Sequence, residues 1–165
     1  MGKPVYAVRI LARGLVMAGT VLGPACGAQD RLQSLPTVPA AATAYQTQYE
    51  GCALKPVFRA ARSQGEWRTV LAEMGHRCDS AFADSVDFGR VMLLTAASGS
   101  RAHGSRGVTI ERAGMLGDTL HVLVQVREPG RCTATMAPSS PMHVVRLPRS
   151  DAPVRFHVRT EKRCD

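Results

Sequence analysis

The five histidines are the residues best suited to chemistry in this chain, because a neutral imidazole can bind a metal ion or move a proton. His121, His143 and His157 fall in segments with strand-like patterns, and His121 and His157 occupy the polar sides of theirs. Neighbouring strands could bring two of the three histidines together. No carboxylate accompanies them at an informative spacing, so the sequence predicts no metal centre, no cofactor and no catalytic residue.

The serines do not form a hydrolase motif. A Ser-His-Asp hydrolase places its serine on a strained turn, with a base and backbone amide donors assembled around it. The nearest match, Gly104-Ser105-Arg106-Gly107, leads into a strand-like segment and not into a helix. The surrounding residues 99–107 also lack the Gly-Lys-Ser/Thr ending of a nucleotide-binding loop. The sequence therefore favours a protein that is not an enzyme.

Residues 98–107 form a Gly/Ser/Arg loop that carries Arg101, His103 and Arg106. These side chains could attract an acidic partner, and loops on rigid β scaffolds often carry binding residues. The alternative is a solvated connection between two strands. We take Arg101, His103 and Arg106 as the candidate binding residues.

The N-terminal residues 1–28 have the layout of an export signal. Lys3, Arg9 and Arg13 precede the apolar stretch 14–22, which is too short for a permanent transmembrane helix, and small residues follow it. Two processing routes stay open. The stretch before Cys26 resembles a bacterial lipoprotein signal, although its leucine lies one place early and a proline interrupts it, so Cys26 is the candidate lipidation site. Ordinary cleavage after Ala28 is the other route.

The remaining cysteines, at positions 52, 78, 132 and 164, fit two disulfides in an exported domain. The closest two are 26 positions apart, whereas zinc sites usually contain close cysteine pairs. A strand over 55–62 and a helix over 65–74 would return the chain near its starting point, which favours Cys52 with Cys78. Cys132 with Cys164 then follows by exclusion, and the other two connectivities stay open.

The formal charge of +8 does not by itself indicate nucleic-acid binding. Three of the bases belong to the N-terminal segment, and the others are spread along the chain with acidic residues nearby. Nucleic-acid binding needs a concentrated basic face, commonly with aromatic stacking platforms for single strands. We therefore expect no nucleic-acid partner.

The pattern of apolar residues predicts a mainly β (α+β) domain. The apolar run 91–97 reads as a central strand, and the alternating segment 120–126 follows a tight Gly117-Asp118 turn whose first residue needs a positive φ. Ser63 and Glu66 match a capping box before the one short helix, which buries Trp67. Further strands are predicted at 57–60, 142–147 and 154–159, the last with three apolar residues facing inward. We expect a small antiparallel β-sandwich or barrel-like sheet, braced by disulfides, over residues 45–165, after a flexible tether over 29–44.

A combination of these features resembles the PrcB-like C-terminal domain family, named for a lipoprotein subunit of an exported bacterial protease complex. The resemblance covers about residues 67–158. It rests on the tryptophan-bearing helix, Val86-Asp87-Phe88, the apolar strand, the Gly-rich loop from Gly99, the hairpin, and the run Ser140-Pro141-Met142-His143-Val144-Val145. The family's loop resembles Gly-x-Lys/Arg-Pro-Thr-Gly-Gly-Tyr, whereas this loop keeps two glycines and a base but lacks the proline, threonine and tyrosine.

The resemblance implies an accessory role, in which the protein stabilises or assembles an exported protease and supplies no catalytic residue. We expect a protein of the bacterial cell envelope, either periplasmic or attached to the outer membrane, whose only membrane contact is a lipid on Cys26. A protease inhibitor that inserts residues 98–107 into a protease cleft is the alternative, and a hydrolase is a more distant one.

Overall fold

Strand β3 (Val91–Ser98) lies at the centre of the fold and is buried along almost its whole length. The structure is a computed structural model that describes residues 26–47, 53–75, 85–101, 107–130 and 138–163. Seven of the eight residues of β3 are buried. The strand pairs with one neighbour on each side, so the predicted central strand is confirmed.

Two sheets form the β part of the molecule. The first sheet contains β3 together with β1 (Thr43–Thr47), β6 (Met142–Pro148) and β2 (Pro56–Ala61). Its strand order is β1-β6-β3-β2, and all neighbouring strands are antiparallel. In the second, the order is β4-β5-β7, with β4 (Gly107–Leu116), β5 (Thr119–Pro129) and β7 (Val154–Arg163). The prediction of a mainly β fold built as a sandwich is confirmed.

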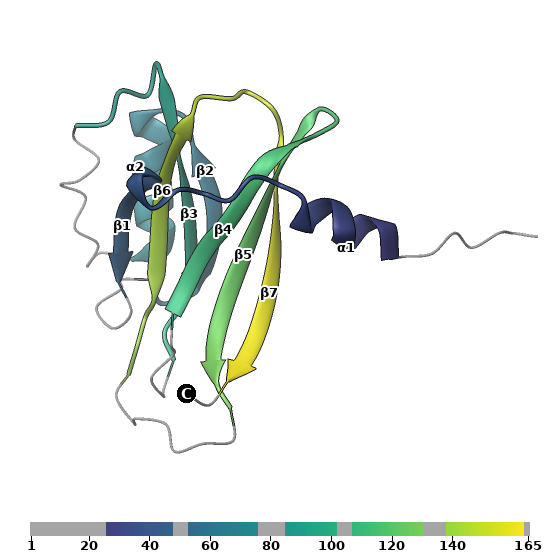
Figure 1. The fold of residues 1–165 in the computed structure, drawn as a ribbon. Helices are drawn as coiled ribbons and strands as arrows, with labels where there is room; N and C mark the ends of the chain where they lie inside the picture. Colours follow the sequence, from purple (N-terminus) through teal and green to yellow (C-terminus); the bar gives the residue numbers. More distant parts are fainter. Residues whose placement is uncertain (1–25, 48–52, 76–84, 102–106, 131–137, 164–165) are drawn as a thin grey trace, which may run out of the picture.

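Helix α2 (Gln64–Met74) forms a third layer on the face of the first sheet that points away from the second sheet (Figure 1). Trp67, Val70 and Met74 are buried against that sheet, where they contact Leu93 and its neighbours. Spacings of three and four residues place these side chains on one side of the helix. The predicted role of Trp67 as a core residue is confirmed.

The cap of α2 follows the sequence prediction in part. The Ser63 hydroxyl accepts a hydrogen bond from the Glu66 N–H at 3.1 Å, as expected for an N-cap serine. The Glu66 carboxylate accepts from the Arg62 N–H at 2.6 Å, one residue before the N-cap position that a capping box would use. The helix start is therefore stabilised from both directions.

The second core lies between the two sheets. Its buried members come from both sheets and include residues of β3, β4, β5 and β6: Met92, Leu94, Ala96, Val108, Ile110, Ala113, Leu120, Val122, Val124, Val126 and Val145. Phe58 of β2 and Phe156 of β7 meet at one side of this core, with ring centroids 6.2 Å apart. Along β5, apolar side chains that point into this core therefore alternate with side chains on the outer face of the sheet.

The hairpin between β4 and β5 turns at Gly117-Asp118, as predicted. Gly117 has a φ of +65°, a conformation that costs glycine little and other residues more. A register shift between Ile110 and Arg112 marks a bulge in β4. The bulge lies beside the chain segment that crosses this strand, as described below.

Strand β7 corrects the expectation of a purely antiparallel fold, because it pairs with β5 in parallel over ten positions. After β5 the chain enters the first sheet as β6 and then returns, so it has reversed direction twice when it reaches β5 again (Figure 1). The expected inward face of β7 holds for Val154 and Phe156, whereas Val158 is 47% exposed. The strand extends past the edge of the core.

Residues 26–47 cross from the second sheet to the first. They contain α1 (Cys26–Gln33), the short helix η1 (Ala40–Ala42) and β1. The sequence predicts a tether over 29–44, whereas the structure places Leu35 at 3% exposure and joins this segment to β4 by backbone hydrogen bonds. The Val38 N–H donates to the Glu111 carbonyl at 2.8 Å, and the Ala113 N–H donates to the Pro36 carbonyl at 3.1 Å.

The sequence also predicts a single helix, and α1 is an additional one. Its eight residues contain one leucine and no apolar repeat, so helical periodicity could not reveal it. The four cysteines at positions 52, 78, 132 and 164 lie outside the described residues, and the disulfide bracing stays a prediction.

The packing of residues 35–36 on β4 can be tested at Gly114. A Cβ at this position would lie 2.9 Å from Pro36 Cδ and 3.1 Å from Leu35 Cδ2. We expect Gly114→Ala to lower the free energy of unfolding by about 1–3 kcal/mol in urea titration, because the crossing segment must shift.

The matched control is Gly65→Ala at the start of α2, where the nearest atom to the new Cβ is Ser63 Oγ at 3.8 Å. Alanine favours helix, so this variant should be as stable as the wild type or slightly more stable. Equal stability of the two variants would contradict the packing of residues 35–36 on β4.

Candidate functional site

The outer face of the second sheet carries polar side chains that alternate with the core residues. On β5 these are His121 and Gln125, with Leu123 between them, and on β7 they are Arg155, His157 and Arg159. The register pairs His121 with Arg155, Leu123 with His157 and Gln125 with Arg159. Parallel pairing therefore builds two adjacent rows of functional side chains on one surface.

His121 and His157 contact each other across this face. His121 Nδ1 and His157 Nε2 are 2.9 Å apart, and the ring planes differ by 13° with centroids 5.0 Å apart. An N–H···N hydrogen bond at this distance requires one of the two facing nitrogens to lack a proton. The sequence predicts that neighbouring strands could bring two of the histidines together, and in the structure the two that meet are His121 and His157.

The electrostatics of the pair disfavour full protonation. Burial is the main cause that lowers the pKa of His157, and the charges of His121 and Arg155 lower it further. A second proton would place two imidazolium groups beside an arginine. Protonation of His157 is therefore disfavoured in the folded chain.

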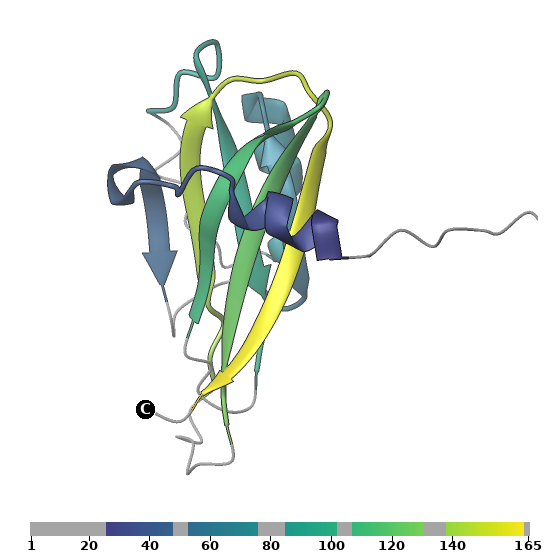
Figure 2. The same cartoon turned by 45° about the vertical axis from the view of Figure 1, so that its right-hand side comes forward.

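Helix α1 lies across β5 and β7 on this face (Figure 2). Leu32 is half-buried there, and Leu35 just after the helix is buried. The Arg112 guanidinium donates to the Leu35 carbonyl at 2.6 Å, which fixes the point where the segment leaves the helix. The helix therefore divides the outer face into two grooves.

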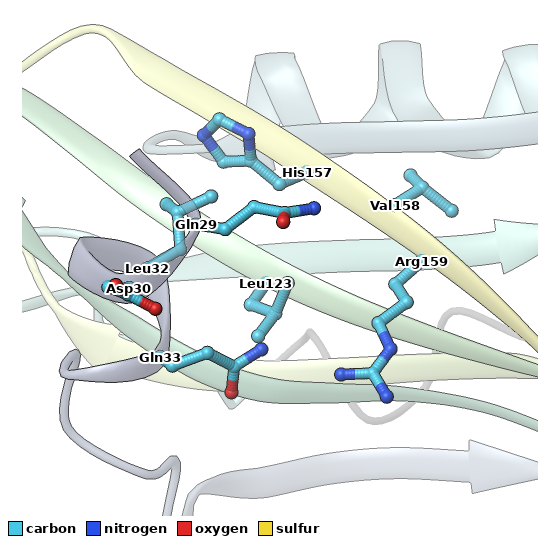
Figure 3. Close-up of a pocket in the computed structure, with 8 residues that line it drawn as sticks. All are labelled: Gln29, Asp30, Leu32, Gln33, Leu123, His157, Val158 and Arg159. Atoms are coloured by element: carbon cyan, nitrogen blue, oxygen red, sulfur yellow. The ribbon is translucent and has the colours of Figure 1, made fainter. Parts of the chain in front are cut away.

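The first groove, here called the Arg159 groove, has a volume of about 780 Å³ and is lined by Gln29, Asp30, Leu32, Gln33, Leu123, His157, Val158 and Arg159. In Figure 3 the Arg159 side chain extends from β7 toward the side of Gln33 and Leu123. The groove combines one carboxylate, one guanidinium, one imidazole and two amides. Such a mixture suits a polar or charged protein segment better than an apolar small molecule.

The second groove, here called the His121 groove, has a volume of about 950 Å³ and is lined by Gly27, Arg31, Leu32, Leu116, Gly117, His121, Arg155 and His157. Leu32 and His157 line both grooves, so they separate the two under the helix. Arg31 and Arg155 make the His121 groove basic. Neither groove is a closed cavity of the kind that surrounds a cofactor.

His143 occupies a different and structural position. Its Nδ1 accepts a hydrogen bond from the Ile110 N–H at 2.9 Å, so the proton is on Nε2, which lies 3.0 Å from Thr43 Oγ1. Burial lowers the pKa of His143, and its side chain is 3% exposed. A surface pocket of about 430 Å³ reaches this residue. Because both ring nitrogens are occupied by contacts within the fold, we assign His143 to structure.

Of the three candidate residues of the predicted binding loop, Arg101 is the one within the described residues. Its backbone exchanges two hydrogen bonds with Ser139, at 2.8 and 3.0 Å, and its side chain lies 3.6 Å from Glu128 in an ion pair. His103 and Arg106 lie outside the described residues. Glu128 is near the far end of β5 from His121, so Arg101 does not join the grooves beside α1.

Within the described residues, no three His, Cys, Asp or Glu side chains lie close enough to share a metal ion. None of the described helices has both the length and the apolar character needed to cross a bilayer.

Sequence reasoning missed the two grooves because they depend on α1, whose residues the sequence analysis assigns to the signal and the tether. The only sequence indication is the pair Leu32 and Leu35, three positions apart.

We compared the chain with models of known protein families, with curated proteins and with solved structures, and none of the three comparisons found a match. The relation to the PrcB-like family therefore stays an expectation from the residues quoted above.

The lowered pKa values of His143 and His157 predict acid destabilisation. Both groups bind protons more readily in the unfolded chain, whose histidines titrate near pH 6.5, so protonation favours unfolding. We expect the free energy of unfolding to fall as the pH is lowered from about 7.5 to about 5. The two histidines have lower pKa values in the folded chain than in the unfolded chain. The loss of unfolding free energy therefore begins near the unfolded pKa and continues as the pH falls.

The contribution of the pair can be isolated with His157→Gln, which removes the titrating group and keeps an amide near His121. The pH dependence of its unfolding free energy should be shallower than that of the wild type. Thr160→Ala, an exposed change on the same strand, is the control and should keep the wild-type slope. An unchanged slope for His157→Gln would show that the pair does not resist protonation.

Proposed function

We propose that this chain is a non-catalytic binding subunit of an exported bacterial protein complex, and that it holds a protein partner at the outer face of the second sheet. The observation that carries the proposal is the form of this face, in which a helix crosses two strands and leaves a groove on each side. Arg155 and Arg159 are exposed beside these grooves. A charged, open surface of this kind suits a protein partner.

The contacts of the described histidines support a role without catalysis. His121 and His157 bind each other, and His143 binds a backbone amide and a threonine hydroxyl. A general base needs a free lone pair within reach of a substrate proton and commonly an orienting carboxylate. Among the described residues, no carboxylate orients any of these three imidazoles.

The resemblance to the PrcB-like family suggests the kind of partner, which is an exported protease that this subunit stabilises or assembles. Cys26 is the first residue of α1. Lipidation there would place the outer face close to a membrane surface, whereas cleavage after Ala28 would remove the first three residues of the helix. The proposed location is the periplasm or the periplasmic side of the outer membrane.

A protease inhibitor is the second candidate. Arg101 is the fourth residue of the predicted loop 98–107, and its two backbone hydrogen bonds to Ser139 hold the loop at this point. A loop held in this way could enter a protease cleft. The two candidates make opposite predictions for protease activity.

The first test is affinity purification of the tagged protein from its native envelope, with intact-mass measurement of the same sample. We expect an exported protease to co-purify and to lose activity more slowly with the protein than without it. A mass increase on Cys26 equal to that of a lipid modification would support the anchored form. Stoichiometric loss of protease activity would instead favour the inhibitor, and the absence of any partner would contradict both.

Charge reversal tests which face is used. Arg155→Glu combined with Arg159→Glu should reduce partner recovery at least tenfold, because both side chains are exposed beside the grooves. The control is Arg68→Glu on α2, an arginine that is also exposed but lies on the opposite layer of the molecule. Equal recovery with both variants would place the partner on another surface.

A further inference from the structure

Strand β7 is the last strand of the second sheet and has one free edge. It pairs with β5 through all ten of its residues, and no other strand in the described part of the chain pairs with it. Ten residues are a long edge for a small domain, and free edges are natural sites for the addition of another strand.

The direction of the backbone groups along this edge follows from two hydrogen bonds. The Pro153 carbonyl accepts from the Leu120 N–H at 2.8 Å, and the Arg163 carbonyl accepts from the Gly130 N–H at 2.9 Å. Both carbonyls therefore point toward β5. Because consecutive residues of a strand point their backbone groups to opposite sides, Val158, Thr160 and Lys162 direct their N–H and carbonyl groups to the free side.

Helix α1 limits which part of the edge is accessible. It crosses β7 at His157, which lines the grooves on both sides of the helix. Figure 2 shows that the strand continues well beyond this crossing toward its C-terminal end. The half of β7 from Val158 to Arg163 is therefore the open half.

The side chains on this half are basic with one exposed apolar residue. Arg159 and Lys162 are exposed and have no ion-pair partner among the described residues, and Val158 is 47% exposed. The one acidic residue, Glu161, accepts a hydrogen bond from Gln125 at 2.8 Å and also binds Arg163. The open edge therefore has a positive charge that the described fold does not neutralise.

We propose that the edge of β7 from Val158 to Arg163 binds an extended acidic segment of the partner protein, which adds to the sheet as a fourth strand. This inference rests on the proposed function and specifies the chemistry of the partner. Main-chain hydrogen bonds supply affinity in this mode of recognition, and the side chains beside the strand supply specificity. A second copy of this chain is disfavoured, because pairing two β7 edges would bring like charges together.

The alternation of β7 defines the pattern of the added strand. Arg159 lies on the outer face, so acidic residues are expected on that face of the partner strand, where opposite charges on adjacent strands attract. Val158 and Lys162 lie on the other face, so an apolar residue is expected opposite Val158 and an acidic residue opposite Lys162. The partner segment therefore combines acidic residues with an apolar residue over about six positions, the length of the open edge.

The test uses a ten-residue peptide with alternating glutamate and valine, and a matched peptide with lysine in place of glutamate. Binding to the purified full-length protein is measured by fluorescence anisotropy at low and high salt. Val158→Pro removes one outward N–H from the middle of the edge and leaves the β5 ladder intact, because proline is tolerated at a free edge. Val158→Thr keeps this N–H and is the control.

We expect the glutamate peptide to bind and the lysine peptide to bind at least tenfold more weakly. Val158→Pro should weaken binding at least tenfold, whereas Val158→Thr should change it by less than threefold. Unchanged circular dichroism and an unchanged thermal midpoint for both variants would show that the fold is retained. Arg159→Glu is a second test that leaves the backbone unchanged, and it should reverse the preference between the two peptides.

Three results would overturn the inference: equal binding of the two peptides, equal binding by the two Val158 variants, or Arg159-dependent binding to phosphatidylglycerol vesicles without peptide binding. The last result would identify the edge as a membrane contact. Recovery of the same exported protease by the wild type and by Val158→Pro would leave the proposed function standing and exclude this edge as its site.

Discussion

The fold depends on covering both faces of β3. Its residues are apolar on each side, so one sheet face must contact α2 and the other must contact a second sheet. A helix of 11 residues covers one face through Trp67, Val70 and Met74. The β4–β5 hairpin and β7 cover the other, and their inward side chains form the larger core. Because each sheet of this sandwich takes strands from distant parts of the sequence, the chain must cross between the sheets several times.

One buried polar residue and one chain segment connect the two sheets. His143 of β6 accepts a hydrogen bond from β4 and contacts Thr43 of β1, so a single imidazole connects both sheets. Burying such a group costs free energy unless its hydrogen bonds are made, and here both ring nitrogens have partners. Residues 35–38 run beside the bulge in β4 and continue through η1 into β1. The same segment places α1 on the outer face of β5 and β7. The two grooves lie between this helix and the strands, so they depend on the position of the segment.

The outer face of the second sheet therefore combines features that come from separate constraints. Alternation along β5 and β7 requires polar side chains there, and the parallel register brings His121 and His157 into contact. Helix α1 covers the middle of the face and leaves the end of β7 uncovered. An edge strand with exposed lysine and arginine resists pairing with its own copies, and the same charges attract an acidic segment.

The central strand, the hairpin turn at Gly117 and the helix with its Ser63 cap could be predicted from the sequence, because each depends on local periodicity or on one residue's backbone preference. The sequence also predicts His121 and His157 on polar strand faces. The parallel pairing of β7 with β5 and the contact between these two imidazoles could be seen only in the folded structure. The direction and neighbours of a strand depend on the route of the intervening chain, which local patterns do not record. The position of α1 likewise depends on Leu32, which lies beside Leu116 of β4 and Leu123 of β5, and on Leu35, which packs on Gly114 of β4. A helix this short has little stability without such packing.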